Sequence, residues 1–177
     1  EVKIVDGDGK EVPSGKAGEI ILKGDNVSPG YWGIAEETEE TFRNGWLYTG
    51  DLGYRDSDGY IFIIDRKKDI IISGGENVSS KEVEGVIQQH SAVNEAAVIG
   101  VADKEWGEAV MAVVSLKPQY KGKVTEEEII SFCKARLAGY KRPKSAVLVD
   151  EIPKNSAGKI AKAELKRIYR GNVGSLN

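Results

Sequence analysis

The chain has 177 residues, of which 40% are hydrophobic and 30% charged, a composition that predicts a globular protein and excludes a disordered or collagen-like chain. No apolar run approaches the ~18 residues of a membrane-spanning helix. One cysteine, Cys133, and one histidine, His90, are too few for a structural zinc site or a histidine-based catalytic pair. A lone cysteine is typical of a reducing compartment, so we expect a cytoplasmic protein without a metal site of its own.

Charge is distributed unevenly along the chain. Residues 1–64 carry 6 basic and 13 acidic side chains, whereas residues 65–177 carry 19 and 15, which together give the net charge of −3. The change falls at the charged run 65–69, with the sequence Asp-Arg-Lys-Lys-Asp. This run indicates a domain boundary or hinge, and a helix face is the alternative. The chain begins with Glu1 and its only methionine is Met111, so we expect it to be part of a longer protein.

The first part of the chain predicts strands joined by turns. Strands are expected at Val2–Val5, Glu19–Lys23, Trp46–Thr49 and Tyr60–Ile64, with one helix at Glu36–Phe42. Two stretches, 6–9 and 56–59, mimic the start of a calcium loop. Both lack the later ligands and the closing glutamate, so they are interpreted as hairpin turns.

The second part predicts a mixture of helices and strands, which makes the whole chain α+β. Capping boxes begin two helices, one at Ser79 with Glu82 and one at Thr125 with Glu128. The apolar face of the first helix is expected to continue as far as His90, which would serve as a helix end. Strands are expected at Ala96–Val101, Ala109–Leu116 and Ala146–Val149, and a last helix at 161–169.

Four short segments could carry chemistry. Asp51 follows a glycine at a strand end, where a carboxylate could accept both hydroxyl protons of a vicinal diol or simply cap a turn. Lys159 ends a polar loop, from which an ammonium could reach a phosphate or face water. The segment 140–144 places a tyrosine beside three cations, which suits a base and a phosphate. A net charge of −3 argues against nucleic acid as the partner. Gly74 and Gly75 indicate either a turn or a place where another group passes close to the backbone.

These segments occur together and in a fixed order, and as a set they resemble the acyl-CoA synthetases of the adenylate-forming superfamily. The segments are Thr49-Gly50-Asp51, the run 65–69, Ser73–Val78, Glu82–Glu84, Trp106–Glu108, Tyr140–Lys144 and Pro153–Lys159. The likeness covers about residues 1–170 and is nearest to AMP-forming fatty-acyl and aryl-CoA ligases, which implies a place in fatty acid metabolism. The family's triphosphate loop, adenine pocket and acyl pocket have no counterpart in this chain.

The resemblance implies a domain organisation. Residues 1–64 would be a small β-barrel-like subdomain at the end of the large domain, and residues 65–68 a hinge. Residues 69–177 would be the mobile C-terminal domain, a mixed sheet flanked by helices. The C-terminal domain would rotate between two half-reactions, with Lys68 at the hinge.

The resemblance also implies roles for individual residues. Asp51 would bind the ribose hydroxyls of the nucleotide, Arg66 would support the ribose and the phosphate side, and Lys159 would be the catalytic lysine of adenylation. The residues expected to bind CoA are Gly75, Trp106, Tyr140, Arg142 and Lys144. ATP, AMP and CoA are the expected substrates and products, with Mg²⁺ accompanying ATP through ligands outside this chain.

Two other functions share part of this pattern. An adenylation domain that loads a carrier protein would need Asp51, Arg66 and Lys159 but no stack for the CoA adenine. A non-enzymatic binding module would need none of the catalytic geometry. For the CoA ligase we expect a small-molecule carboxylic acid, ATP and CoA as partners, and an inactive fragment when residues 1–177 stand alone. The identity of the acid and the oligomeric state have no signal in this sequence.

Overall fold

The computed structural model describes residues 1–170, and the chain divides into two compact units, Glu1–Lys68 and the part that begins at Asp69. The charged run lies at the junction. Asp65 and Arg66 end strand β5 (Ile61–Arg66), and Lys67–Asp69 form a single 3-10 turn, η1. The run is therefore a strand end followed by a turn, and the helix-face alternative is wrong.

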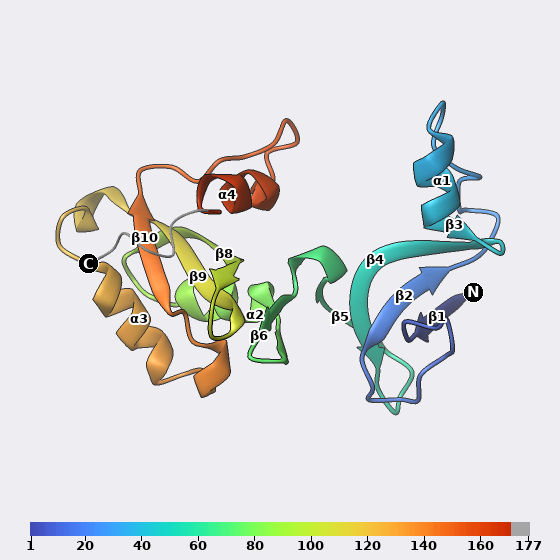
Figure 1. The fold of residues 1–177 in the computed structure, drawn as a ribbon, viewed down its shortest axis with the longest axis horizontal. Helices are drawn as coiled ribbons and strands as arrows, with labels where there is room; N and C mark the ends of the chain where they lie inside the picture. The colour runs from blue at the N-terminus through green and yellow to red at the C-terminus, as the bar shows by residue number, and fades with distance from the viewer. Residues whose placement is uncertain (171–177) are drawn as a thin grey trace. The chain divides into compact units, whose positions relative to one another are not determined.

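The first unit is built on one antiparallel sheet of five strands (Figure 1). Its strands are β1 (Val2–Val5), β2 (Gly18–Leu22), β3 (Phe42–Arg43), β4 (Trp46–Arg55) and β5. The order is β1-β2-β4-β3, and the long, curved β4 also pairs with β5. The short helix α1 (Ala35–Thr41) precedes β3. Two consecutive residues are buried in each of β1 and β2. These side chains form the core of the unit, and they are Ile4, Val5, Ile20 and Ile21.

Aspartate side chains close two tight turns of this unit. Asp6 Oδ1 accepts hydrogen bonds from the backbone N–H groups of Asp8 and Lys10, both at 3.0 Å. Asp56 Oδ1 accepts in the same way from Asp58 at 3.0 Å and Tyr60 at 2.8 Å. An aspartate that bonds its own backbone two residues on stabilises a turn without any metal. The prediction of hairpin turns at both places is confirmed.

The second unit has a mixed sheet with helices on both faces (Figure 1). Its strands are β6 (Ile71–Ser73), β7 (Glu76–Val78), β8 (Val93–Asp103), β9 (Gly107–Leu116) and β10 (Ser145–Val149). The central β9 pairs antiparallel with β8 and parallel with β10. Its helices are α2 (Ser80–Ile87), α3 (Glu126–Lys134) and α4 (Lys162–Ile168), with 3-10 turns η2 (Pro118–Tyr120) and η3 (Gly139–Lys141).

The position of β9 at the centre of the sheet explains why its sequence is apolar almost throughout. Val110, Ala112 and Val114 face one core, which includes residues of α2 and α3. Met111 and Val113 face the other, which includes Leu165 of α4. A strand covered on both faces needs apolar side chains at every position.

Side-chain caps begin two of the helices where the sequence predicts them. Ser79 Oγ and Thr125 Oγ1 accept hydrogen bonds from the N–H groups of Glu82 and Glu128, both at 3.3 Å. The helix α2 ends at Ile87, so the prediction that it runs to His90 is wrong by about one turn. His90 lies in the following turn, where its ring packs edge-on against Phe132. None of the helices within residues 1–170 is long and apolar enough to cross a membrane.

Candidate functional site

In the first unit, two side chains predicted to bind nucleotide face each other across neighbouring strands. Asp51 of β4 is the register partner of Arg66 of β5. Arg66 Nε lies 2.7 Å from Asp51 Oδ1, with 51% of the Arg66 side chain and 29% of the Asp51 side chain exposed. An ion pair of this length is a charge-assisted hydrogen bond, and it holds both groups at one place on the sheet.

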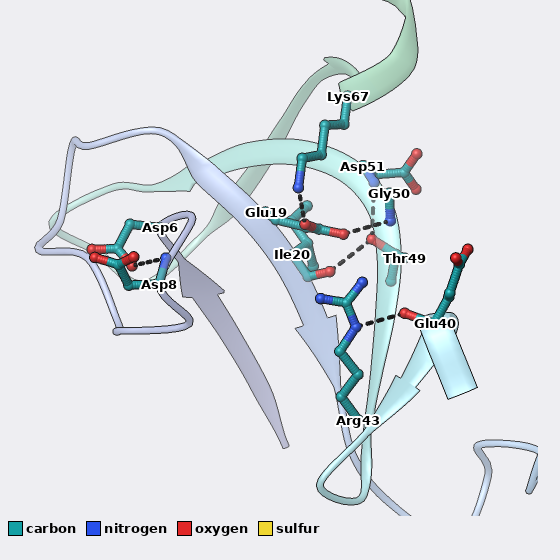
Figure 2. A network of polar contacts seen from close by, with 10 residues as sticks. All are labelled: Asp6, Asp8, Glu19, Ile20, Glu40, Arg43, Thr49, Gly50, Asp51 and Lys67. Atoms are coloured by element: carbon teal, nitrogen blue, oxygen red, sulfur yellow. Dashed lines mark hydrogen bonds and ion pairs between the residues drawn. The ribbon is translucent and has the colours of Figure 1, made fainter. Parts of the chain in front are cut away.

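A second layer of polar contacts fixes the backbone around Asp51 (Figure 2). Thr49 Oγ1 donates to the Ile20 carbonyl at 2.7 Å and accepts from the Asp51 N–H at 3.1 Å. Glu19 accepts from the Gly50 N–H at 3.2 Å and from Lys67 Nζ at 2.9 Å. The register of the sheet shifts on both sides of this network, at 19–21 in β2 and 52–53 in β4. Irregularities of this kind re-aim side chains next to functional sites.

Asp65 supports the other partner of the pair. Its side chain is buried, and its Oδ1 accepts a hydrogen bond from the Arg66 N–H at 2.8 Å. A carboxylate that holds the backbone of Arg66 limits the positions from which the guanidinium can reach Asp51. Lys68, the predicted hinge residue, lies in η1 at the junction of the two units.

In the second unit, Gly74 and Gly75 form the turn between β6 and β7. Their φ angles are +60° and +84°, a region that favours glycine. A Cβ on Gly74 would lie 2.6 Å from the ring of Trp106, whereas one on Gly75 would meet no atom within 4 Å. Gly74 N–H also donates to the Trp106 carbonyl at 2.9 Å. The glycine turn therefore packs directly against Trp106 through Gly74, and open space remains beside Gly75.

Glu108 holds this turn against the main sheet. Its Oε2 accepts a hydrogen bond from the Ile72 N–H of β6 at 2.8 Å. Gly100 of β8 makes room for the carboxylate, because a Cβ there would lie 2.9 Å from Glu108 Cδ. Sequence reasoning gave Glu108 no role, and the same is true of Glu19 and Lys67 in the first unit.

A lysine lies over the ring of Trp106, and the segment that follows Gly139 packs close to the glycine turn. Lys144 Nζ lies 4.6 Å from the centroid of the Trp106 ring, within the range of a cation–π contact. The turn η3, which contains the exposed Tyr140, packs against β7. Arg142 follows η3, and its Nε donates to the Leu137 carbonyl at 3.0 Å. The structure thus gathers Trp106 and Lys144 at the glycine turn, with Tyr140 and Arg142 on the neighbouring segment.

Lys141 takes a different part from its neighbours. Its Nζ lies 2.7 Å from Glu82 Oε1, and this hydrogen bond raises the pKa of Lys141 above its usual value. The pair ties η3 to the first turn of α2. The ammonium of Lys141 is therefore engaged in an ion pair within the protein, whereas the ammonium of Lys144 lies over the Trp106 ring.

Lys159 lies near the tip of a tight loop. Asn155 Oδ1 accepts hydrogen bonds from the N–H groups of Ala157 and Lys159, both at 3.0 Å, and Gly158 has a φ of +75°. Lys154 and Ile160 pair across the base of the loop as an isolated antiparallel bridge. The Lys159 side chain is exposed, and within residues 1–170 its ammonium forms no hydrogen bond or ion pair. The backbone is thus fixed while the charge is available.

Metal binding has no candidate among these residues. Within residues 1–170, no group of three or more histidine, cysteine, aspartate or glutamate side chains could hold a metal ion. Residues 1–170 therefore offer no cluster of this kind for Mg²⁺.

Comparison with known proteins shows which proteins this chain is similar to. Residues 82–159 match the AMP-binding enzyme C-terminal domain. The chain is 46% identical over 164 residues to the 2-succinylbenzoate–CoA ligase of Bacillus cereus, a match that covers 93% of this chain and 33% of that protein.

Solved structures give the same result. ATP-bound MatB from Rhodopseudomonas palustris has a TM-score of 0.88 and 40% identity, covering 97% of this chain and 34% of that one. The o-succinylbenzoate CoA synthetase MenE from Bacillus subtilis, in complex with the acyl-adenylate intermediate OSB-AMP, has a TM-score of 0.86 and 42% identity over 94% of this chain and 33% of that one. The chain spans about a third of the length of these relatives. It is therefore homologous to the adenylate-forming CoA ligases and contains their AMP-binding enzyme C-terminal domain.

Proposed function

We propose that this chain is the C-terminal part of an ATP-dependent carboxylic acid:CoA ligase, which forms an acyl-adenylate and then an acyl-CoA. The observation that supports this most is identity of more than 40% to two proteins named for CoA ligation, over more than nine tenths of the chain. Residues 1–64 would belong to the end of the large domain, residues 65–68 to the hinge and residues 69–177 to the mobile C-terminal domain.

The first half-reaction joins the acid to AMP. A carboxylate oxygen attacks the α-phosphorus of ATP, the bond to the β-phosphate oxygen breaks, and pyrophosphate leaves. Asp51 accepts hydrogen bonds from the ribose hydroxyls, and Arg66 stabilises Asp51 and lies on the phosphate side. Lys159 supplies positive charge where negative charge builds between the two reactants. Its uncommitted ammonium on a fixed loop suits that role.

The second half-reaction transfers the acyl group. The thiol sulfur of CoA, as the thiolate, attacks the acyl carbon, the bond to the AMP oxygen breaks, and AMP leaves. Gly75 gives the pantetheine arm room, and Trp106 and Tyr140 stack against the adenine. Arg142 and Lys144 bind the 3′-phosphate. The open space beside Gly75 and the contact of Lys144 with the Trp106 ring support this set. Lys68 is the pivot on which the C-terminal domain would turn.

For the acid, we propose an aromatic carboxylate. Two of the relatives are named for 2-succinylbenzoate, an aryl acid, so the comparisons favour the aryl side of the predicted likeness and give no support to fatty acid metabolism. The Trp106 and Lys144 pair also favours CoA over a carrier protein as the acceptor, because a carrier presents no adenine to stack.

The test is a comparison of the complete ligase with the 177-residue chain. The complete ligase, supplied with ATP, 2-succinylbenzoate and CoA, should release pyrophosphate and form the CoA thioester, measured by a coupled assay and by mass spectrometry. The 177-residue chain alone should release none, because positioning by the rest of the site is missing. Pyrophosphate release without any thioester, together with acyl transfer to a carrier protein, would replace this proposal with the carrier-loading one.

A further inference from the structure

We propose that Lys162 is a positioning residue for adenylation, one that holds the Lys159 loop in place through Glu84 and Ser80. The inference rests on the proposed function, because it takes Lys159 as the adenylation lysine. Lys162 Nζ lies 2.7 Å from Glu84 Oε1 and 2.6 Å from Ser80 Oγ. Lys162 belongs to α4 and the other two residues to α2, so a single ammonium joins two helices that are far apart in sequence.

The cluster is shielded from water and extends into the sheet. The side chains of Lys162 and Glu84 are only 15% and 14% exposed, and Ser80 is buried. Glu84 Oε1 also accepts a hydrogen bond from the Val98 N–H of β8 at 2.8 Å. Shielded charges interact more strongly than surface charges, and removing one leaves the other without its partner. The carboxylate therefore fixes α4 to both α2 and β8.

This anchor acts at one end of the Lys159 loop. Lys162 comes three residues after Lys159, and between them the Ala161 N–H donates to the Pro153 carbonyl at 2.8 Å. The other end is held by Lys154, whose Nζ lies 2.7 Å from Glu95 Oε1. Both legs of the loop are thus tied by ion pairs, while the ammonium of Lys159 remains uncommitted. A loop that carries a catalytic charge needs such an anchor, because a displacement of ~1 Å can reduce the rate by ~10²-fold.

Another cation of the same helix provides the matched control. Arg167 is 79% exposed, and its only ion pair within residues 1–170 is a contact of 3.7 Å with Glu164 on its own helix. Removal of its charge changes the helix surface but not the loop. Arg167→Met therefore reproduces the loss of charge and the change in helix composition of Lys162→Met without touching the cluster.

The kinetic experiment separates the two half-reactions in the complete ligase. Lys162→Met should lower kcat for pyrophosphate release by about ten- to a hundredfold, with KM for ATP and acid nearly unchanged. Thioester formation from supplied acyl-adenylate should stay within about twofold, since it does not use Lys159. Arg167→Met should match the wild type in both assays. Glu84→Gln, whose amide oxygen can still accept from both Val98 and Lys162 but carries no charge, should show a smaller loss of the same kind than Lys162→Met. The double variant should be no worse than Lys162→Met.

A second readout follows the loop itself. Hydrogen exchange in the complete ligase should accelerate in peptides covering residues 153–161 of Lys162→Met and stay unchanged in β9, which reports that the domain is folded. Equal losses in both half-reactions, or loop exchange equal to that of the wild type, would overturn the proposal. Lys159→Ala distinguishes the two levels of inference. If it spares adenylation, the proposed function fails. If it lowers adenylation while Lys162→Met keeps the wild-type rate, only the positioning role fails.

Discussion

The two units hold their candidate side chains in different ways. In the first, Asp51 and Arg66 stand on paired strands and are bound to each other at 2.7 Å. In the second, Lys159 and Trp106 stand on loops, where Lys159 is exposed and Trp106 half-buried. The proposed roles divide along the same line, because the strand pair would serve both half-reactions and each loop group only one. A group needed throughout can be fixed permanently, whereas a group needed once can lie on a loop that domain rotation brings in and removes.

The largest expected effect tests a loop group. In the complete ligase, Lys159→Ala should lower acyl-adenylate formation by about 10²–10³, the usual scale for the loss of one preorganised electrostatic group. Thioester formation from supplied acyl-adenylate should survive. Both rates can be followed by pyrophosphate release and by single-turnover thioester formation. Lys123→Ala, which changes another exposed lysine, serves as the control. If Lys159→Ala lowered both half-reactions equally, Lys159 would not be a group that serves only adenylation.

The next effect tests the strand pair. Asp51→Asn keeps the shape of the side chain but weakens its charge-assisted bonds to about half, which should lower both half-reactions by about 10–100-fold. The ion pair with Arg66 is lost at the same time. Asp58→Asn, in the hairpin turn between β4 and β5, changes a carboxylate of the same unit that has no place in the network and should leave both rates unchanged. A loss confined to one half-reaction would contradict the proposal that the strand pair serves both half-reactions.

Local signals predicted the fold well. The strands at Val2–Val5 and Ala109–Leu116 follow from short apolar runs bounded by turn residues, and the helices that begin after Ser79 and Thr125 follow from their caps. The three-residue strands β6 and β7 are too short to leave a pattern beside the glycine turn. The predicted helix ran on to His90 because His90 continues the helical spacing of Val83 and Ile87 in the sequence. In the structure it lies in the turn after α2, where its ring packs against Phe132.

The supporting residues of the site could not be predicted in this way. Glu19 and Gly50 are 31 positions apart, and Glu108 and Ile72 are 36 positions apart. Such contacts arise only when the strands pair, so no local spacing marks them. Lys162 is a similar case, since Ser80 lies 82 positions away. The resemblance to a family gave roles to the groups proposed to meet substrate, while the residues that position those groups became visible only in the structure.

A smaller effect tests the CoA set of the second unit. Arg142→Ala should raise KM for CoA by about tenfold or more, because a charge-assisted hydrogen bond is worth ~1.5–3 kcal/mol. It should scarcely change KM for dephospho-CoA, which lacks the 3′-phosphate. The contrast matters because the substitution also removes the bond from Arg142 to the Leu137 carbonyl, and structural damage would affect both substrates equally. Trp106→Ala should weaken both alike, since both present the same adenine face.

The smallest effect concerns stability and separates the two glycines of the turn. Gly75→Ala should destabilise the second unit by about 1–2 kcal/mol, the cost of a left-handed backbone for a residue with a Cβ, because no atom lies within 4 Å of the new methyl group. Gly74→Ala carries the same strain and also forces its methyl group to within 2.6 Å of the Trp106 ring, so its loss should be larger.

Urea unfolding of the complete ligase, followed by signals from the second unit, measures both losses. Thioester formation should separate the two variants differently from stability. Gly75→Ala narrows the open space proposed for the pantetheine arm, so it should impair thioester formation by more than its loss of stability explains. Adenylation should persist in both variants under conditions where they are folded. If Gly75→Ala formed thioester at the wild-type rate, the open space beside Gly75 would not be the passage for CoA. Gly75 would then have to be removed from the proposed CoA site, which would keep Trp106.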